Sequence, residues 1–195
     1  MPADVITNLN WVDILLIIAI IRIVYIGVKQ GLLVELAKIL GVILGVVIAF
    51  HYYVGLSEVV VASSPLPTGF SDLLCFVILF IIPVLLFKFF REGLTLVVKA
   101  EPIPFVNWWG GLLLGALRAG IFCSVFIYIL LISGFGYIEK STWQSYCTNY
   151  LVNVAPTIYS FSFEKIISKF FPGEHVNNTV LDVTSNNQNP ERKSK

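Results

Sequence analysis

The feature that most constrains this chain is a stretch from Pro102 to Ile138 that contains a single charged residue, Arg118. Three more long apolar runs precede it. In the core of a bilayer an unpaired backbone amide costs several kcal/mol, so lipid-exposed chain must form helices or a closed barrel. A helix needs about 20 mostly apolar residues to cross the hydrocarbon, and the runs are that long and do not alternate. The sequence therefore predicts a bundle of membrane-spanning helices.

Composition supports a chain that crosses the membrane several times. Hydrophobic residues make up 57% of the 195 residues and charged residues only 13%, whereas a typical soluble domain has about 25% charged residues. The net charge of +1 gives no basic field, so we expect the lipid bilayer, and no nucleic acid, as a partner. Three scattered cysteines, Cys75, Cys123 and Cys147, form neither a disulfide framework nor a zinc site, and we expect no cofactor and no metal.

The ends of the spans are set by residues that favour turns. Residues 63–69 are rich in serine, proline and glycine, and Pro102 and Pro104 disfavour helix at the start of the fourth run. A competing frame for the fourth span, 119–138, would move Arg118 from the hydrocarbon to the interface, and we prefer the first frame. The expected spans cover about residues 11–28, 32–53, 70–90 and 109–131.

The residues after the fourth run have helical periodicity but are too polar to span a bilayer. Trp143, Tyr150 and Val154 share one apolar face, and Pro156 separates this segment from a second one. We expect amphipathic helices at the membrane surface at about 143–155 and 157–171, and a disordered polar tail over 172–195. The predicted fold class is an all-α membrane protein, in which residues 1–171 form four transmembrane helices followed by short amphipathic interfacial helices.

The distribution of lysine and arginine predicts the orientation. These residues flank the connections after the first and third spans, whereas the N-terminal tail and the second connection contain none. Because positively charged connections stay in the cytoplasm, we expect both termini on the opposite side. Lys140, Lys165 and Lys169 oppose this orientation, but most of them are distant from the last span.

No arrangement typical of an enzyme is evident in the sequence. The two histidines, His51 and His175, are far apart, and none of the common hydrolase, metalloprotease, phosphate-binding or dinucleotide-binding motifs occurs. No nucleophile and base can be named as a pair. We expect a protein that is not an enzyme.

Charged residues within the apolar runs are the sharpest candidates for a functional site. A charge at the centre of a bilayer costs roughly 3 kcal/mol or more, so such residues face the bundle interior and form pairs. We hypothesise that Glu35 pairs with Arg118 across the second and fourth spans. One interpretation is an ion or substrate path. The other, which we favour, is a structural pair, with Lys38 and Arg22 extending to the interface.

Glycines recur at intervals of four residues along the runs. Close contact between backbones holds membrane helices together, and small residues permit it. Packing within the chain is the favoured interpretation, and self-association into a homo-oligomer is the alternative. The expected packing positions are Gly31, Gly41, Gly45, Gly111, Gly115 and Gly120, with Gly27 preceding Gly31 by four residues.

Three segments are similar to a known family. They are Trp11–Asp13 (WVD) at the start of the first run, Gln30–Leu36 (QGLLVEL), and Gly111–Gly120 (GLLLGALRAG), which combines two small residues with a membrane arginine. With these segments the chain resembles the colicin V production protein family over about residues 10–161. It departs from the family at 107–108, where Asn-Trp replaces the frequent Asp-Arg, and at Ala119, where glycine is common.

The resemblance implies a multi-pass protein of the bacterial inner membrane, with both termini in the periplasm under the orientation above. It implies a non-catalytic role in the production or secretion of a peptide toxin of the colicin V type, extending to envelope maintenance, with other membrane proteins as possible partners. A rival class is a small membrane transporter or channel that uses Glu35 and Arg118. A membrane enzyme has the least support.

Overall fold

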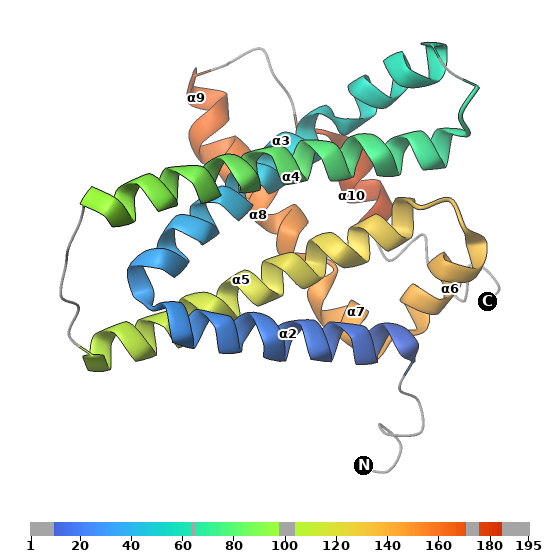
Figure 1. Ribbon diagram of the computed structural model, residues 1–195. Coiled ribbons are helices and arrows are strands. Elements are labelled where there is room, and N and C mark those ends of the chain that lie inside the picture. The colour runs from blue at the N-terminus through green and yellow to red at the C-terminus, as the bar shows by residue number, and fades with distance from the viewer. Residues whose placement is uncertain (1–9, 64, 98–103, 171–175, 185–195) are drawn as a thin grey trace.

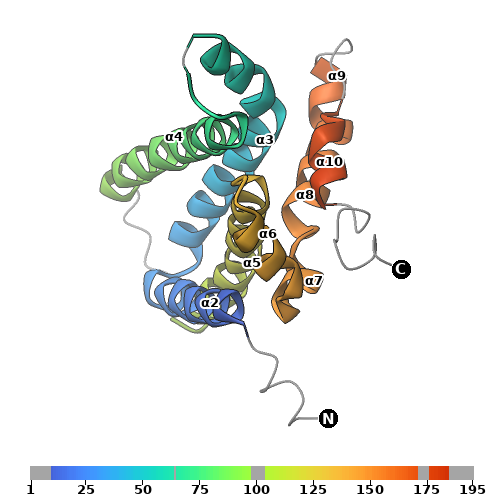
Figure 2. The same ribbon diagram turned by 90° about the vertical axis from the view of Figure 1, so that its right-hand side faces the viewer.

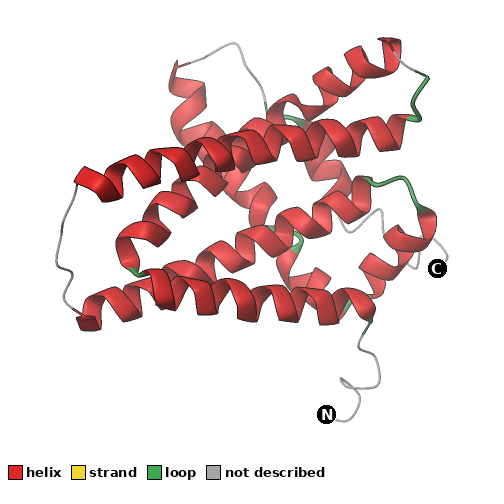
Figure 3. Ribbon diagram, viewed as in Figure 1, coloured by secondary structure: helices red, strands yellow, loops and turns green. Residues whose placement is uncertain are grey.

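The computed structural model describes residues 10–63, 65–97, 104–170 and 176–184. Every regular element in these ranges is a helix, as Figures 1 and 3 show. The predicted all-α class is confirmed.

Four long helices make up most of the described chain. Each of them is long and apolar enough to cross a membrane, so all four predicted spans are present. They are α2 (Trp11–Gln30), α3 (Leu32–Ser63), α4 (Thr68–Val97) and α5 (Pro104–Ile132).

Several helix ends differ from the sequence-based expectation, and α4, expected to end at residue 90, continues to Val97. α3 was expected to end at residue 53 but continues to Ser63, and Ser57 in this extension is buried. α5 was expected from 109 but begins at Pro104, because a proline in the first turn lacks only an N–H group that would have no helical partner. α5 ends at Ile132 before Gly134, whose φ of 74° favours glycine. The competing frame of 119–138 for the fourth span is therefore wrong.

The long helices form two antiparallel pairs, α2 with α5 and α3 with α4 (Figures 1 and 2). Between α2 and α5 the backbones touch. A Cβ atom built on Gly111 would lie 2.5 Å from the carbonyl oxygen of Gly27, and one built on Gly27 would lie 2.9 Å from Cα of Gly115. No side chain fits between backbones at these distances, so these positions require glycine.

The other predicted packing glycines divide into two groups. Gly41 and Gly45 of α3 lie against α4, where added Cβ atoms would meet Phe87 at 2.7 Å and Phe80 at 3.0 Å. At Gly120, by contrast, a Cβ atom would have nothing within 4 Å. The expectation of a packing role is wrong for Gly120, because no other element closely approaches this position of α5.

An aromatic core joins the two pairs. Phe50 of α3 contacts Phe76 of α4 and Tyr128 of α5, with ring centroids 5.2 and 4.6 Å apart. The hydroxyl groups of Tyr53 and Tyr128 lie 2.8 Å apart in this core and are fully enclosed. Each buried hydroxyl therefore has a partner, which removes the cost of an unpaired polar group in an apolar environment.

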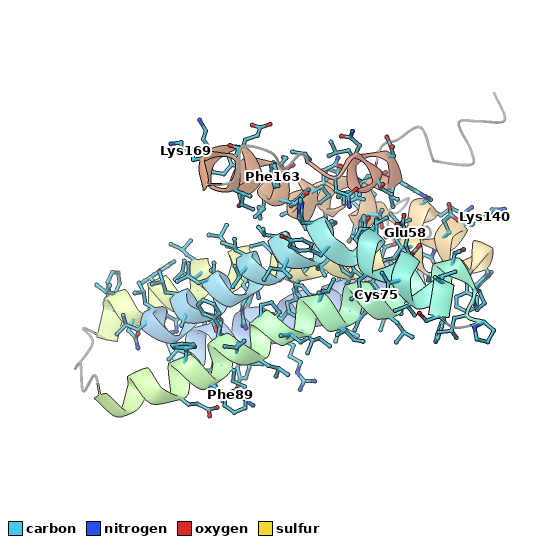
Figure 4. All side chains as sticks on the ribbon, turned by 90° about the horizontal axis from the view of Figure 1, so that it is seen from above. Glu58, Cys75, Phe89, Lys140, Phe163 and Lys169 are labelled. Carbon is cyan, nitrogen blue, oxygen red and sulfur yellow. The ribbon has the colours of Figure 1, made fainter. Side chains whose placement is uncertain are left out.

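The chain after α5 folds into shorter helices. These form a layer on one side of the long helices, over α3 and α5 (Figures 2 and 4). Ala155 and Tyr159 of this layer are completely buried. Their apolar face packs on protein, although the sequence had assigned it to lipid. The elements are α6 (Gly136–Gln144), α7 (Tyr146–Leu151), α8 (Val154–Ser162), the π-helix η1 (Phe163–Ile167), α9 (Ser168–Phe170) and α10 (Asn178–Thr184).

The boundaries in this layer differ from the expected 143–155 and 157–171. Trp143 belongs to α6, and Pro156 does not interrupt a helix, because it lies in the first turn of α8. Within the expected disordered tail of 172–195, residues 178–184 form α10, and Val180 is fully buried. Disorder is thus wrong for that segment, since Val180 packs into the core. Residues 172–175 and 185–195 of the expected tail lie outside the described residues.

The α2–α5 contact gives the first prediction. The substitution Gly111→Ala places a methyl group against the Gly27 backbone, which cannot yield as a side chain can, and should lower the free energy of unfolding by about 1–3 kcal/mol. The matched control is Gly120→Ala on the same helix, which should be neutral or slightly stabilising because alanine favours helix. Thermal unfolding of the purified proteins in one detergent measures both. Equal melting temperatures for Gly111→Ala and wild type would contradict the close contact.

Candidate functional site

Glu35 lies in the first turn of α3 and is completely buried. The chain reverses between α2 and α3 at Gly31, which has a φ of 80°. Few residues other than glycine adopt this conformation. The turn directs the start of α3 toward the α2–α5 contact, so that a Cβ atom on Gly27 would lie 3.5 Å from the carboxylate carbon of Glu35.

The carboxylate of Glu35 lies between two cations. Nε of Arg118 is 2.9 Å from Oε2, and Nζ of Lys38 is 2.6 Å from Oε1. The structure therefore places the two residues paired in our hypothesis, Glu35 and Arg118, in contact across α3 and α5. Arg118 also approaches the carbonyl oxygen of Ile23 on α2, at 3.5 Å, and Lys38 donates to the side-chain oxygen of Gln30.

The three charges form a compact cluster, which we call the charge cluster and define as Glu35, Lys38 and Arg118. Lys38 and Arg118 retain 16% and 13% of their side-chain exposure, whereas Glu35 retains none. Removing a carboxylate from solvent is costly, and the attraction of two nearby cations offsets that cost. The cluster connects α2, α3 and α5, so it can stabilise their junction.

Asn107 of α5 completes the same junction. Its side-chain oxygen accepts a hydrogen bond of 2.9 Å from the backbone N–H of Leu32, the first residue of α3. The first N–H groups of a helix lack partners within the helix, and Gly31 before them has no side chain to supply one. Asn107 thus caps α3 from a different helix. The sequence comparison noted this position only as a departure from a frequent aspartate.

A second polar site, which the sequence analysis missed, is built around Asp13 of α2. This carboxylate is fully buried. It accepts hydrogen bonds from the Ser145 hydroxyl at 2.6 Å and from the backbone N–H groups of Cys147 at 2.8 Å and Tyr146 at 3.3 Å. It also accepts from the backbone N–H of Asn10 at 3.0 Å, which forms a capping box on α2. Asp13 therefore holds the first turns of both α2 and α7.

The Asn-x-x-Asp spacing of residues 10 and 13 was the one signal for this site. An acidic residue three positions after Asn matches a helix N-terminus. The partners on α7 carry no signal, because they are mainly backbone N–H groups. The amide of Asn10 reaches the same layer, where it donates to the backbone oxygen and to the hydroxyl of Ser141, both at 2.7 Å.

Two further contacts attach the C-terminal layer to the long helices. The fully buried Ser124 of α5 accepts from the N–H of Ala155 at 2.8 Å and donates to the carbonyl oxygen of Val152 at 3.1 Å. The Tyr159 hydroxyl lies 3.1 Å from Nδ1 of His51 and accepts from the N–H of Asn177 at 3.0 Å. The Ser124 bonds satisfy backbone groups that the break between α7 and α8 leaves open, and the Tyr159 hydroxyl satisfies an N–H group just before α10.

In the ranges that the structure covers, no group of three or more His, Cys, Asp or Glu side chains could hold a metal ion, and His175 lies outside them. Burial, with the adjacent Asp13 carboxylate, raises the pKa of the Cys147 thiol to about 11. Since the thiolate is the nucleophile, the raised pKa lowers the fraction of this thiol that is reactive near neutral pH.

Comparison with known proteins gives two findings. The sequence model of the colicin V production protein family matches residues 12–156, which include Asp13, Glu35 and Arg118. The chain is also similar to YshB of Bacillus subtilis (strain 168), described as an uncharacterized transmembrane protein. The two are 21% identical over 160 residues, which cover 74% of this chain and 90% of that protein. No solved structure matches the chain.

The charge cluster gives the second prediction. Glu35→Gln leaves two largely enclosed cations facing no anion, and should lower the free energy of unfolding by about 3 kcal/mol. Arg118→Gln should cost less, because Lys38 remains on the carboxylate. The double variant should lose less free energy of unfolding than the two single variants lose together. Unfolding of the purified proteins in detergent measures all three losses.

A control with the same chemical change is available on the same helix. Glu58 is exposed near the far end of α3 (Figure 4), and Glu58→Gln should leave the unfolding midpoint unchanged. Strictly additive losses for the pair would show that Glu35 and Arg118 do not interact.

Asp13 gives the third prediction. Asp13→Asn replaces one carboxylate oxygen by an NH₂ group that faces N–H donors. It should lower the free energy of unfolding by about 1.5–3 kcal/mol. The loss should appear as faster limited proteolysis between α6 and α8, because α7 loses its attachment. Thr157→Ala, at an exposed position of α8, should leave the cleavage rate unchanged. Unaltered cleavage of Asp13→Asn would exclude the anchoring role.

Proposed function

The chain belongs to the colicin V production protein family, and we propose that it acts as a non-catalytic assembly protein of the bacterial inner membrane. In this role it supports the production or export of a peptide toxin of the colicin V type. It does so by holding other membrane proteins against its helices, and the same role extends to maintenance of the envelope.

The observation that carries this proposal is that the buried charges pair with each other at a junction of three helices. Glu35 is fully enclosed and paired at a junction where the backbones of α2 and α5 touch. A charge that moves an ion needs water and space beside it, whereas this carboxylate is enclosed by two cations and a glycine contact. Such an arrangement fits a rigid scaffold better than a transport path.

The proposed orientation has both termini in the periplasm. It is supported by the arrangement of the helix ends: the end of α2, the start of α3, the end of α4 and the start of α5 lie at one end of the bundle (Figure 1). Lys29, Lys38 and Lys88 lie toward this end. Under the positive-inside rule it is the cytoplasmic end.

Transport remains the second candidate function. It is favoured by one observation, namely that an acidic and a basic side chain from different helices meet inside the apolar bundle. Intramembrane ionisable residues mark ion and proton paths in many membrane proteins. The experiment below includes an assay that distinguishes the two candidates.

The fourth prediction concerns the function itself. In a colicin V-producing host that lacks its own family member, the wild-type chain should restore toxin activity in the medium. Gly120→Ala should restore it equally, and Gly111→Ala should not, because the scaffold is disrupted.

The orientation is tested separately. A phosphatase reporter fused after Lys195 should be active in these cells, since that enzyme works only in the periplasm.

Two outcomes would contradict the proposal. Failure of the wild-type chain to restore export, at normal levels in the membrane, would exclude the role in toxin production. Ion flux through proteoliposomes that is lost in folded Glu35→Gln would favour the transporter, whereas flux equal to that of empty liposomes supports the scaffold.

A further inference from the structure

Arg22 is an exposed cation on the outward side of a membrane-spanning helix. We call this side the outer face of α2, and it is otherwise largely apolar. The other residues on this face are also exposed, and one of them is basic. They are Ile14, Leu15, Ile18, Ile21, Tyr25 and Lys29. The α5 helix packs on the opposite side of α2, through Gly27 and Leu16. The outer face is therefore the side that α2 presents to its surroundings.

No anion of the described chain neutralises Arg22. The ion pairs of the charge cluster join Glu35 to Lys38 and to Arg118, and neither includes Arg22. Arg22 precedes the end of α2 by about two helical turns, or about 12 Å along the axis. By extending toward the helix end, the guanidinium of an arginine at this depth reaches the headgroup region, where the lipid supplies phosphate groups.

A second cation lies on the same column of the outer face. Lys29 follows Arg22 by two turns, so both side chains project in nearly the same direction. Nζ of Lys29 lies 4.6 Å from the ring centroid of Tyr25, which places the ammonium group back along the helix toward Arg22. The two cations and the Tyr25 hydroxyl thus border one stretch of the outer face, about 10 Å long.

We propose that Arg22, Tyr25 and Lys29 bind the phosphate of one anionic phospholipid. The guanidinium binds two phosphate oxygens in the bidentate manner that arginine favours. Lys29 supplies the second positive charge, and the acyl chains lie along Ile18 and Ile21, deeper in the bilayer. Tyrosine is common at this level of a membrane, where one end of the ring is apolar and the other is hydrated.

The apolar part of the outer face favours a lipid over a soluble anion. Free phosphate would neutralise Arg22 but would leave the neighbouring isoleucines without a partner. A net anionic lipid is favoured over a zwitterionic one, because two cations meet one phosphate and an additional ammonium group would be repelled. The site adds a ligand to the scaffold role and does not depend on that role.

The fifth prediction tests this site on the full-length protein in detergent. The protein is titrated with phosphatidylglycerol and, separately, with phosphatidylcholine, and native mass spectrometry records the bound lipid. One phosphatidylglycerol should remain bound to wild type in preference to phosphatidylcholine. Arg22→Gln should lower its retention about fivefold, since one cation near a membrane anion is worth about 1 kcal/mol. Excess inorganic phosphate should not displace it.

The matched control removes one charge elsewhere. Lys140 is exposed on α6, away from α2's outer face (Figure 4), and Lys140→Gln should retain the lipid as wild type does. Melting temperatures confirm that each variant is folded. Wild-type retention by folded Arg22→Gln would overturn the site, and so would displacement by inorganic phosphate. If wild type is dimeric in this detergent, and folded Arg22→Gln is monomeric but retains the lipid, Arg22 belongs to a contact between two copies instead.

Discussion

The structure depends on the contact between the backbones of α2 and α5 at Gly27, Gly111 and Gly115. In lipid no hydrophobic force drives helices together, so the close approach of backbones supplies the packing energy. This contact also brings the first turn of α3 against α5, since the α2–α3 turn at Gly31 follows directly. Glu35 and Arg118 meet only because these three helices converge. The glycines therefore determine the geometry of the charge cluster as well as the packing.

Polar side chains at the remaining junctions serve the backbone. Asn107 caps the start of α3, Asp13 binds the first N–H groups of α7, and Ser124 bridges the break before α8. Each of these side chains binds backbone groups of an element other than its own helix, and Asp13 caps its own helix as well. In an apolar environment an unpaired backbone group costs more than in water. These contacts consequently define where the short helices begin, and they attach the C-terminal layer to the spans.

The spans and the charge cluster were accessible from the sequence for one physical reason. For long apolar runs that contain isolated charges, one arrangement has the lowest free energy. It is a bundle of membrane helices in which the charges pair inside. The four spans and the contact of Glu35 with Arg118 follow from that arrangement. The glycine spacing gave the close contacts at Gly41 and Gly111, but it could not distinguish Gly120, because spacing does not reveal which face of α5 is covered.

The C-terminal layer was less accessible, because tertiary contacts decide its helix boundaries. Ser145 separates α6 from α7 where the Asp13 carboxylate accepts the N–H groups that follow, and neither residue marks the break in the sequence alone. α10 lies in a polar stretch whose composition favours disorder, yet Val180 and the side chain of Asn177, which donates to the Phe50 carbonyl at 2.9 Å, attach it to the bundle. These few contacts outweighed the composition of the neighbouring residues.

The bonds between Asp13 and the start of α7 join α2 to residues that the ribosome adds more than a hundred positions later. During synthesis the carboxylate enters the membrane region long before its partners exist. It remains hydrated, or held by Asn10 alone, until the last quarter of the chain emerges. The order of biogenesis follows: the long helices insert first, and closure of the layer over α3 and α5 is the step that completes the molecule. A nascent chain that stops after α5 would thus carry an acid at the start of α2 without the partners that α7 provides.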